Sequence, residues 1–258
     1  MGRLLLFLSH INEEAELANL LKLTLESAFL GLVNVFVSSS PASVLPGARW
    51  LEEITDSLKS CAVELVLCSP ESVTRPWVNF EAGAGWIRDV KVIPLCHSGM
   101  SKSELPIPLN LLQAAHLSDV AEMADVFGAI AAALGSGNPA VDLATFRTAV
   151  VHFEEDYTFW SKFRASYTFG ASYFANSPYA QDFISGKSFD VQLTETQTKE
   201  LAEGLSFLIA RRLLAVERVG GTSVTTTGTF YGMRIAFRSE FGPVLTAFVQ
   251  RSQRRNVV

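Results

Sequence analysis

The sequence has few of the features that mark secreted, membrane-spanning or metal-binding proteins. Only three of its 258 residues are cysteines, and none of them forms a C-x-x-C pair. This excludes a disulfide scaffold and argues against a zinc site, so the cysteines suit a reducing cytoplasm. A long uncharged stretch, residues 27–48, contains five serines, two prolines and two glycines, whereas a membrane span needs about 20 predominantly apolar residues. We therefore expect a cytoplasmic protein with no membrane association.

Charge is also scarce, and it does not point to a polyelectrolyte partner. Charged residues make up 18% of the chain and the formal net charge is −5. Residues 1–139 hold 8 Lys and Arg against 15 Asp and Glu, while residues 140–258 hold 13 against 11. This balance does not favour nucleic acid as a partner. The 48% of hydrophobic residues is enough to build a sizeable core.

The first half of the chain alternates short apolar runs with helical patterns. The runs predict five buried strands at residues 4–8, 33–37, 63–68, 92–96 and 115–117. Helical spacing between and after them predicts helices at residues 17–28, 50–58, 77–88 and 120–134. This order is typical of a doubly wound α/β domain with a parallel sheet, which we place at residues 1–137. Glycine, serine and proline in residues 135–139 then mark a break.

The second half, residues 140–258, has a different composition. Residues 145–185 hold 12 of the 27 aromatic residues, and their spacing predicts a long amphipathic helix over residues 146–160. Further patterns predict a helix over residues 193–215, a β-hairpin joined through Gly220-Gly221, and a last helix over residues 241–250. We expect a smaller, mainly helical α+β domain that resembles a winged helix. Its predicted role is regulation or oligomerisation. The aromatic helix either packs within this domain or forms a subunit interface.

Ligands of open parallel sheets bind beyond the carboxyl ends of the strands, which directs attention to the residues just after each strand. The most informative stretch follows the third strand, where Trp77 and Glu81 stand one helical turn apart on one face. A carboxylate beside an aromatic wall and small residues is partly desolvated, which raises its pKa and suits charge stabilisation. The spacing alone also fits a surface glutamate beside a core tryptophan.

Several ordered blocks of the first half resemble a bacterial Toll/interleukin-1 receptor (TIR) domain. They are LFLSH at residues 6–10, VFVSS at 35–39, PGARWLEEI at 46–54, LCSPES at 67–72, WVNFE at 77–81 and VIPL at 92–95. The resemblance covers about half of the chain and implies a flavodoxin-like fold with five strands. Many bacterial members cleave NAD at the nicotinamide–ribose bond, and the glutamate at the position of Glu81 is essential to that cleavage.

The resemblance implies that Glu81 is the catalytic residue and that NAD is the substrate, with no cofactor and no metal. It assigns substrate binding to residues at the ends of the first two strands, in the BB loop at residues 38–49 and in two tryptophans: Phe7, Ser9, His10, Ser38, Pro46, Gly47, Arg49, Trp50 and Trp77. Two of these assignments leave an alternative. The spacing of Trp50 with Ile54 and Leu58 also fits a core position, and His10 suits a polar wall of the site better than a base.

The sequence thus supports two hypotheses of different classes. The first is an NAD glycohydrolase or cyclase, an antiphage immune effector that is activated by self-assembly through TIR–TIR and C-terminal contacts. The second is a non-catalytic TIR interaction module that scaffolds partners or interferes with TIR signalling. Glu81 beside Trp77 favours the enzyme, because a pure adaptor has no need of that carboxylate.

Overall fold

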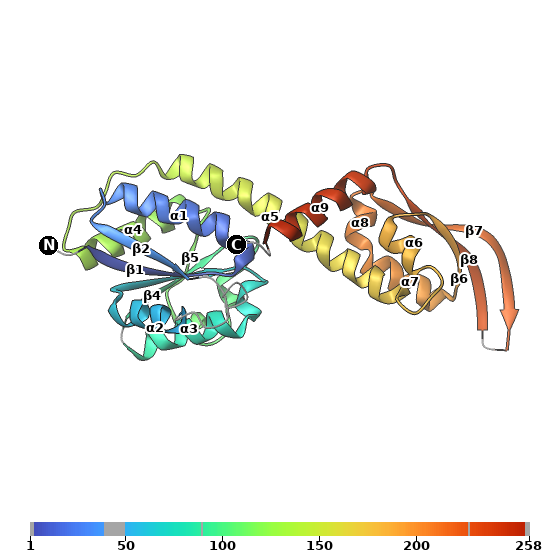
Figure 1. The fold of residues 1–258 in the computed structure, drawn as a ribbon, viewed down its shortest axis with the longest axis horizontal. Helices are drawn as coiled ribbons and strands as arrows, with labels where there is room; N and C mark the ends of the chain where they lie inside the picture. Colours follow the sequence, from blue (N-terminus) through green and yellow to red (C-terminus); the bar gives the residue numbers. More distant parts are fainter. Residues whose placement is uncertain (1–2, 39–49, 89, 227, 256–258) are drawn as a thin grey trace. The chain divides into compact units, whose positions relative to one another are not determined.

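A computed structural model describes residues 3–38, 50–88, 90–226 and 228–255, with the backbone alone for residues 50–53, 254 and 255 (Figure 1). Contacts divide the chain into two compact units, with the boundary between Tyr157 and Thr158. The first unit is an α/β domain, and the second combines helices with an antiparallel sheet. The predicted fold classes of both halves are therefore confirmed.

The sheet of the first unit has five parallel strands in the order β2-β1-β3-β4-β5. Their bounds are Leu4–Ser9 for β1, Val33–Ser38 for β2, Val63–Cys68 for β3, Lys91–Cys96 for β4 and Ala115–His116 for β5. The helices are α1 at Ala15–Ala28, α2 at Trp50–Ser60, α3 at Pro76–Ile87 and α4 at Val120–Leu134. All five predicted strands and all four predicted helices are present, with small shifts at their ends.

Alternation along the central strands gives the sheet two apolar faces. Leu6 and Leu8 of β1 pack into a core with α1, α4 and the first part of α5, whereas Phe7 points to the opposite face and packs against Ile54 and Leu58 of α2. Figure 1 shows α1 and α4 on one side of the sheet and α2 and α3 on the other. Because both faces are covered, the strands read as continuous apolar runs in the sequence.

The boundary between the units lies further along the chain than the predicted break at residues 137–140. It falls inside α5, which runs as one helix over Leu143–Phe174 and so extends well beyond the predicted residues 146–160. The physical reason is the aromatic stripe at the start of α5. Phe146, Val150, Phe153 and Tyr157 are buried in the core of the first unit. The start of α5 therefore belongs to the α/β domain.

In the second unit, the rest of α5 is followed by helices and a three-stranded antiparallel sheet of order β6-β8-β7. The helices are α6 at Ala180–Ser185, α7 at Glu195–Gly204, α8 at Ser206–Ala210 and α9 at Phe241–Arg255. The strands are β6 at Phe189–Leu193, β7 at Leu214–Thr225 and β8 at Gly228–Phe237. The succession α6-β6-α7-α8-β7-β8, with β8 in the centre of the sheet, agrees with the predicted winged-helix resemblance.

Two details of the second unit differ from the sequence predictions. The predicted helix over residues 193–215 is wrong at both ends, because Leu193 closes β6 and Leu214 opens β7. The predicted turn at Gly220-Gly221 is also wrong. These glycines lie inside β7 at a register shift, and a Cβ on Gly232 would approach the Cα of Gly220 to 3.0 Å. Glycine therefore serves a close approach of two strands here, not a turn.

Candidate functional site

The candidate site is built around Glu81, which lies on α3 beneath the carboxyl ends of β1 and β2. Pro76 opens α3 at the start of the helix, where its missing N–H costs no hydrogen bond. The helical repeat then places Trp77 and Glu81 one turn apart, as predicted. The side chain of Glu81 is fully buried, which excludes the alternative of a surface glutamate.

Three side chains donate hydrogen bonds to the Glu81 carboxylate. Ser9, at the end of β1, donates from its Oγ to Oε2 at 2.5 Å, and Ser38, at the end of β2, donates from its Oγ to Oε1 at 2.6 Å. The indole Nε1 of Trp77 also donates to Oε1, at 2.6 Å. The structure therefore brings together four residues that the sequence assigned to one site. They come from three elements that meet where the strand order reverses.

Burial and hydrogen bonding act on the Glu81 carboxyl in opposite directions. Desolvation raises its pKa, while the hydrogen bonds from Ser38, Ser9 and Trp77 favour the charged form and lower it. The net result is a pKa above the ordinary value of a glutamate. The site thus holds a desolvated carboxylate that preorganised donors stabilise, an arrangement that suits the stabilisation of positive charge.

The remaining predicted site residues have different surroundings. Phe7 is fully buried, stacks on Phe36 with ring centroids 5.6 Å apart, and lies in the same apolar cluster as Trp77. His10 is also buried, and desolvation lowers its pKa against the opposing charge of Glu14, which agrees with a polar wall residue that stays neutral. Pro46, Gly47 and Arg49 lie outside the described residues, as does the side chain of Trp50.

A second buried polar cluster lies at the ends of β1, β3 and β4, and the sequence analysis did not find it. The Oγ of Ser69 donates to Glu14 Oε1 at 2.6 Å and lies 3.2 Å from the hydroxyl of Tyr157, and His97 Nε2 lies 3.2 Å from the same Glu14 oxygen. Desolvation would raise the pKa of Glu14, but His97 and the hydrogen bonds from Ser69 and the Ile11 N–H lower it below the ordinary value. The one available signal was an acid, Glu14, five residues after the end of a buried strand.

Glu64 is a third buried acid that the sequence analysis did not single out. It is the second residue of β3, is fully buried, and neither carboxyl oxygen has a hydrogen-bond partner within the described ranges. Desolvation, with a smaller effect of the Glu81 charge, raises the pKa of Glu64 to about 9. Gly85 of α3 makes room for it, because a Cβ there would overlap Glu64 Oε2.

Neither a metal site nor a membrane segment emerges from the described part of the chain. No group of three or more His, Cys, Asp or Glu side chains is arranged to hold a metal ion there. In the same residues, no helix combines the length and the apolar composition that crossing a bilayer requires.

The fold and the site together define a doubly wound α/β domain with a buried carboxylate at the switch point of its sheet. A family model of the TIR domain matches residues 6–130. Residues 6–130 of this chain are therefore a TIR domain.

Comparison with solved structures finds a similarity to the TIR domains in a structure described as the activated Roq1 resistosome directly recognizing the pathogen effector XopQ. The sequence identity is 14% and the TM-score is 0.30, over 60% of this chain and 81% of that chain. No curated protein matches the sequence significantly.

Proposed function

We propose that the protein cleaves NAD at the bond between nicotinamide and ribose, with Glu81 as the catalytic carboxylate. The observation that carries this proposal is the Glu81 carboxylate itself, which is buried at the switch point of the sheet and held by Ser9, Ser38 and Trp77. A carboxylate with no cation beside it in the described structure is suited to a positive charge that develops only during a reaction.

Cleavage of NAD develops such a positive charge on the ribose. When the bond from C1′ of the ribose to the nicotinamide nitrogen breaks, the nitrogen keeps the electron pair and leaves as neutral nicotinamide. The ribose then carries the positive charge of an oxocarbenium ion until a water oxygen bonds to C1′ and releases a proton. The products are nicotinamide, ADP-ribose and one proton. No general acid is needed for the leaving group, so one carboxylate is enough.

The serine hydroxyls indicate how the substrate would be held. Ser9 and Ser38 place one hydroxyl donor on each oxygen of the Glu81 carboxylate. A ribose carries two neighbouring hydroxyls that can offer the same pair of donors. We infer that the ribose diol replaces at least one serine hydroxyl on Glu81, while the Trp77 indole keeps its hydrogen bond and fixes the carboxylate.

Release of nicotinamide from NAD by the purified full-length chain tests this proposal. Glu81→Gln keeps the size of the side chain and removes its charge, so we expect the rate to fall by about 10²–10³. Glu104→Gln is the matched control, because it removes one acidic charge from an exposed position of the same domain. Equal rates in the Glu81→Gln and Glu104→Gln variants would exclude Glu81 as the catalytic carboxylate.

A second function is favoured by a different observation. Helix α3 exposes three large apolar side chains on the surface, since Phe80, Trp86 and Ile87 are 60%, 52% and 82% exposed. Such a face is typical of protein interaction sites. A non-catalytic TIR interaction module is therefore the alternative. If the wild-type chain releases no nicotinamide at any concentration, this alternative replaces the enzyme.

We also propose that activity depends on self-assembly, with residues 140–258 as the regulatory part, and that the protein acts as a cytoplasmic antiphage effector. Membership of the TIR family supports self-assembly and the effector role. The three free, buried cysteines support the cytoplasm, because free thiols suit a reducing compartment. Self-assembly predicts that NAD cleavage per molecule rises with protein concentration, in step with the mass measured by light scattering. A rate per molecule that is constant across a change from monomer to oligomer would contradict it.

A further inference from the structure

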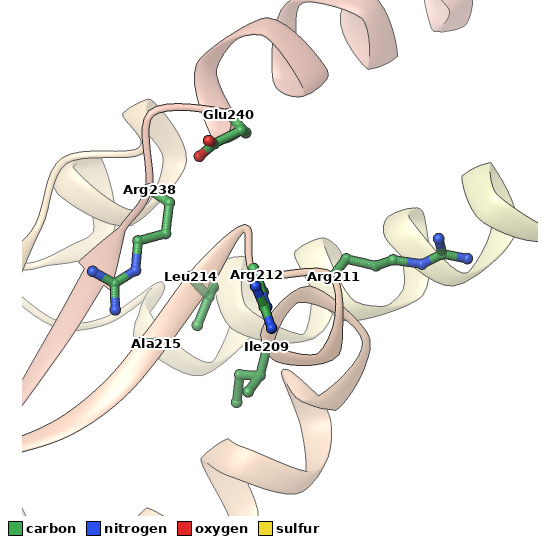
Figure 2. Close-up of a pocket in the computed structure, with 7 residues that line it drawn as sticks. All are labelled: Ile209, Arg211, Arg212, Leu214, Ala215, Arg238 and Glu240. Carbon is green, nitrogen blue, oxygen red and sulfur yellow. The ribbon is translucent and has the colours of Figure 1, made fainter.

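We propose that the second unit binds a small ligand that carries phosphate, in a pocket beside the end of α8. The pocket has a volume of about 670 Å³, which is in the range of small-molecule sites. Figure 2 shows the residues that line it, which come from the end of α8, the start of β7, and the segment between β8 and α9: Ile209, Arg211, Arg212, Leu214, Ala215, Arg238 and Glu240. The lining holds three arginines and one glutamate, and this positive balance favours an anion.

The backbone around the pocket is held by hydrogen bonds between distant segments. The N–H of Arg212 donates to the carbonyl of Ile209 at 2.9 Å, and the N–H of Leu213 donates to the carbonyl of Leu208 at 2.9 Å. The N–H of Arg238 donates to the carbonyl of Leu213 at 3.0 Å, which fixes the end of β8 against this loop. Arg212, in the turn before β7, and Arg238, just after the end of β8, are thus presented on a hydrogen-bonded frame, which lowers the entropic cost of binding.

Arg212 occupies a position where the backbone favours glycine. Its φ angle is +56°, in the left-handed region, and its hydrogen bonds are those of a helix that ends in a Schellman motif. A side chain at this position costs folding free energy that glycine would avoid. The guanidinium of Arg212 has no hydrogen bond or ion pair with any residue that the structure describes. An arginine that is unfavourable for the fold and has no internal partner is available for a ligand.

The other two arginines are held in place by neighbours. Arg238 donates to Glu217 Oε1 at 2.7 Å, and Arg211 lies over the rings of Phe159 and Phe207, each 5.6 Å from the ring centroid. In Figure 2 the side chain of Arg211 extends away from those of Arg212 and Arg238. We therefore assign the anion to Arg212, with Arg238 from the segment after β8 as a second donor that the anion would share with Glu217.

The charge of the neighbouring helices favours a small ligand over the phosphate backbone of nucleic acid. In a winged helix that binds DNA, the second helix of the pair enters the major groove and needs basic residues around it. Here α8 has only five residues and none is charged, while α7 carries Glu195, Glu200 and Glu203 against Lys199. A duplex on this face would meet more acidic than basic charge.

The experiment is calorimetric titration of the full-length chain with inorganic pyrophosphate at low salt. We expect binding to the wild type and a loss of affinity of about tenfold or more for Arg212→Gly, because a charge-assisted pair is removed. Arg238→Gln should lose affinity similarly. Thermal unfolding of Arg212→Gly should occur at the same or a higher temperature than in the wild type, since glycine suits the left-handed position. This combination separates loss of a ligand contact from damage to the fold.

Arg234→Gln is the charge-matched control. It removes one arginine from the same unit, but one that pairs with Asp190 outside the pocket. We expect its affinity for pyrophosphate to stay within about twofold of the wild type, because Arg234 does not line the pocket and its charge is paired with that of Asp190. The proposal fails if the wild type does not bind pyrophosphate, or if Arg212→Gly binds it as well as the wild type does. It fails equally if Arg234→Gln loses as much affinity, or if a short DNA duplex binds through Arg212 more tightly than pyrophosphate does.

Discussion

The two units of the molecule differ most in what they bury. In the first unit the buried polar residues are Ser9, His10, Glu14, Ser38, Glu64, Ser69, Ser72, Glu81 and His97. In the second unit, Ser166 is the one buried polar residue among those described, and its hydroxyl donates to the carbonyl of Gly204 at 2.7 Å. The interior of the second unit instead combines aromatic rings packed against one another with aliphatic side chains, most of them leucines.

The first unit thus buries polar and charged side chains that cost folding free energy, whereas the core of the second unit is almost entirely apolar. Burying a polar or charged side chain costs free energy unless hydrogen bonds replace its lost hydration, and even then the net gain is small. The first unit carries three fully buried glutamates at that cost, and Glu81 and Glu14 are held by donors from separate elements. The second unit places its charges on the surface, where an external ligand can reach them.

The largest expected effect tests whether aromatic packing holds the second unit together. Phe163→Ala should lower the free energy of unfolding of this unit by about 3–5 kcal/mol, because it opens a cavity at a fully buried position. Equilibrium urea unfolding of the full-length chain measures the loss. The ring of Phe163 contacts five others, those of Phe159, Trp160, Tyr167, Phe241 and Phe248.

Val224→Ala is the control for that measurement, because Val224 lies in the same unit but is 78% exposed. Its cost should stay within about 0.5 kcal/mol. A loss for Phe163→Ala that is no larger than the loss for Val224→Ala would mean that the ring cluster does not carry the stability of this unit.

The next effect tests whether the first unit really retains an unfavourable acid. The folded chain keeps the Glu64 proton up to a pKa of about 9, whereas an unfolded chain releases it near the ordinary value of 4.5. The folded state therefore binds more protons between these values, and stability falls as the pH rises through this window. At pH 7 the cost is at most about 3 kcal/mol, since each pH unit contributes about 1.4 kcal/mol.

Glu64→Gln removes this ionisation cost, so it should raise the free energy of unfolding at pH 7 by up to about 3 kcal/mol and have little effect at about pH 4. Urea unfolding at both pH values measures the difference, with Glu104→Gln as the exposed control. The same effect of Glu64→Gln at both pH values would show that Glu64 is not protonated selectively in the folded state.

The sequence predicts the two units unequally well for a physical reason. The strands of a covered parallel sheet are continuous apolar runs, so all five in the first unit could be predicted from the residues alone. In the second unit β6 is a short strand, Phe189–Leu193, in which buried and exposed residues alternate. Leu201, Leu205 and Leu208 keep helical spacing across the break between α7 and α8, and this spacing conceals where the helices end.

The site could be predicted where a local pattern carries it. The spacing of Trp77 and Glu81 on one helix indicates an indole beside a carboxylate, and that hydrogen bond is present. The cluster of Glu14, Ser69 and His97 depends instead on three loops that only the folded sheet brings together. The burial of Glu64 could not be predicted either, because one glutamate in an apolar run does not reveal whether its side chain is exposed to water or buried in the core.

A smaller effect tests whether the donors at the sheet edge keep Glu81 ionised. Ser9→Ala removes the hydroxyl that donates to Glu81 Oε2, so the charged form loses a favourable contact and the already raised pKa should rise further. We expect a further increase in this pKa, measured from the carboxyl carbon of Glu81 by nuclear magnetic resonance. If the chain cleaves NAD, the acidic limb of its pH profile should move up by the same amount.

Ser103→Ala is the matched control for Ser9→Ala, because Ser103 is an exposed serine of the same unit. It should leave the pKa of Glu81 unchanged. An unchanged pKa in Ser9→Ala as well would show that the serine is packed beside the carboxylate without stabilising its charge.

The smallest effect concerns a polar group of the second unit that acts at its surface. Thr194 accepts a hydrogen bond from the N–H of Gln197 at 3.2 Å, and the side chain of Gln197 accepts one from the N–H of Thr194 at 2.9 Å, so together they cap α7. Thr194→Ala should lower the free energy of unfolding by about 1 kcal/mol, because the N–H of Gln197 at the start of the helix loses its acceptor. Thr196→Ala, at an exposed position on the same helix, is the control and should cost less. If both variants lose the same amount in urea unfolding, the cap adds nothing to the stability of this unit.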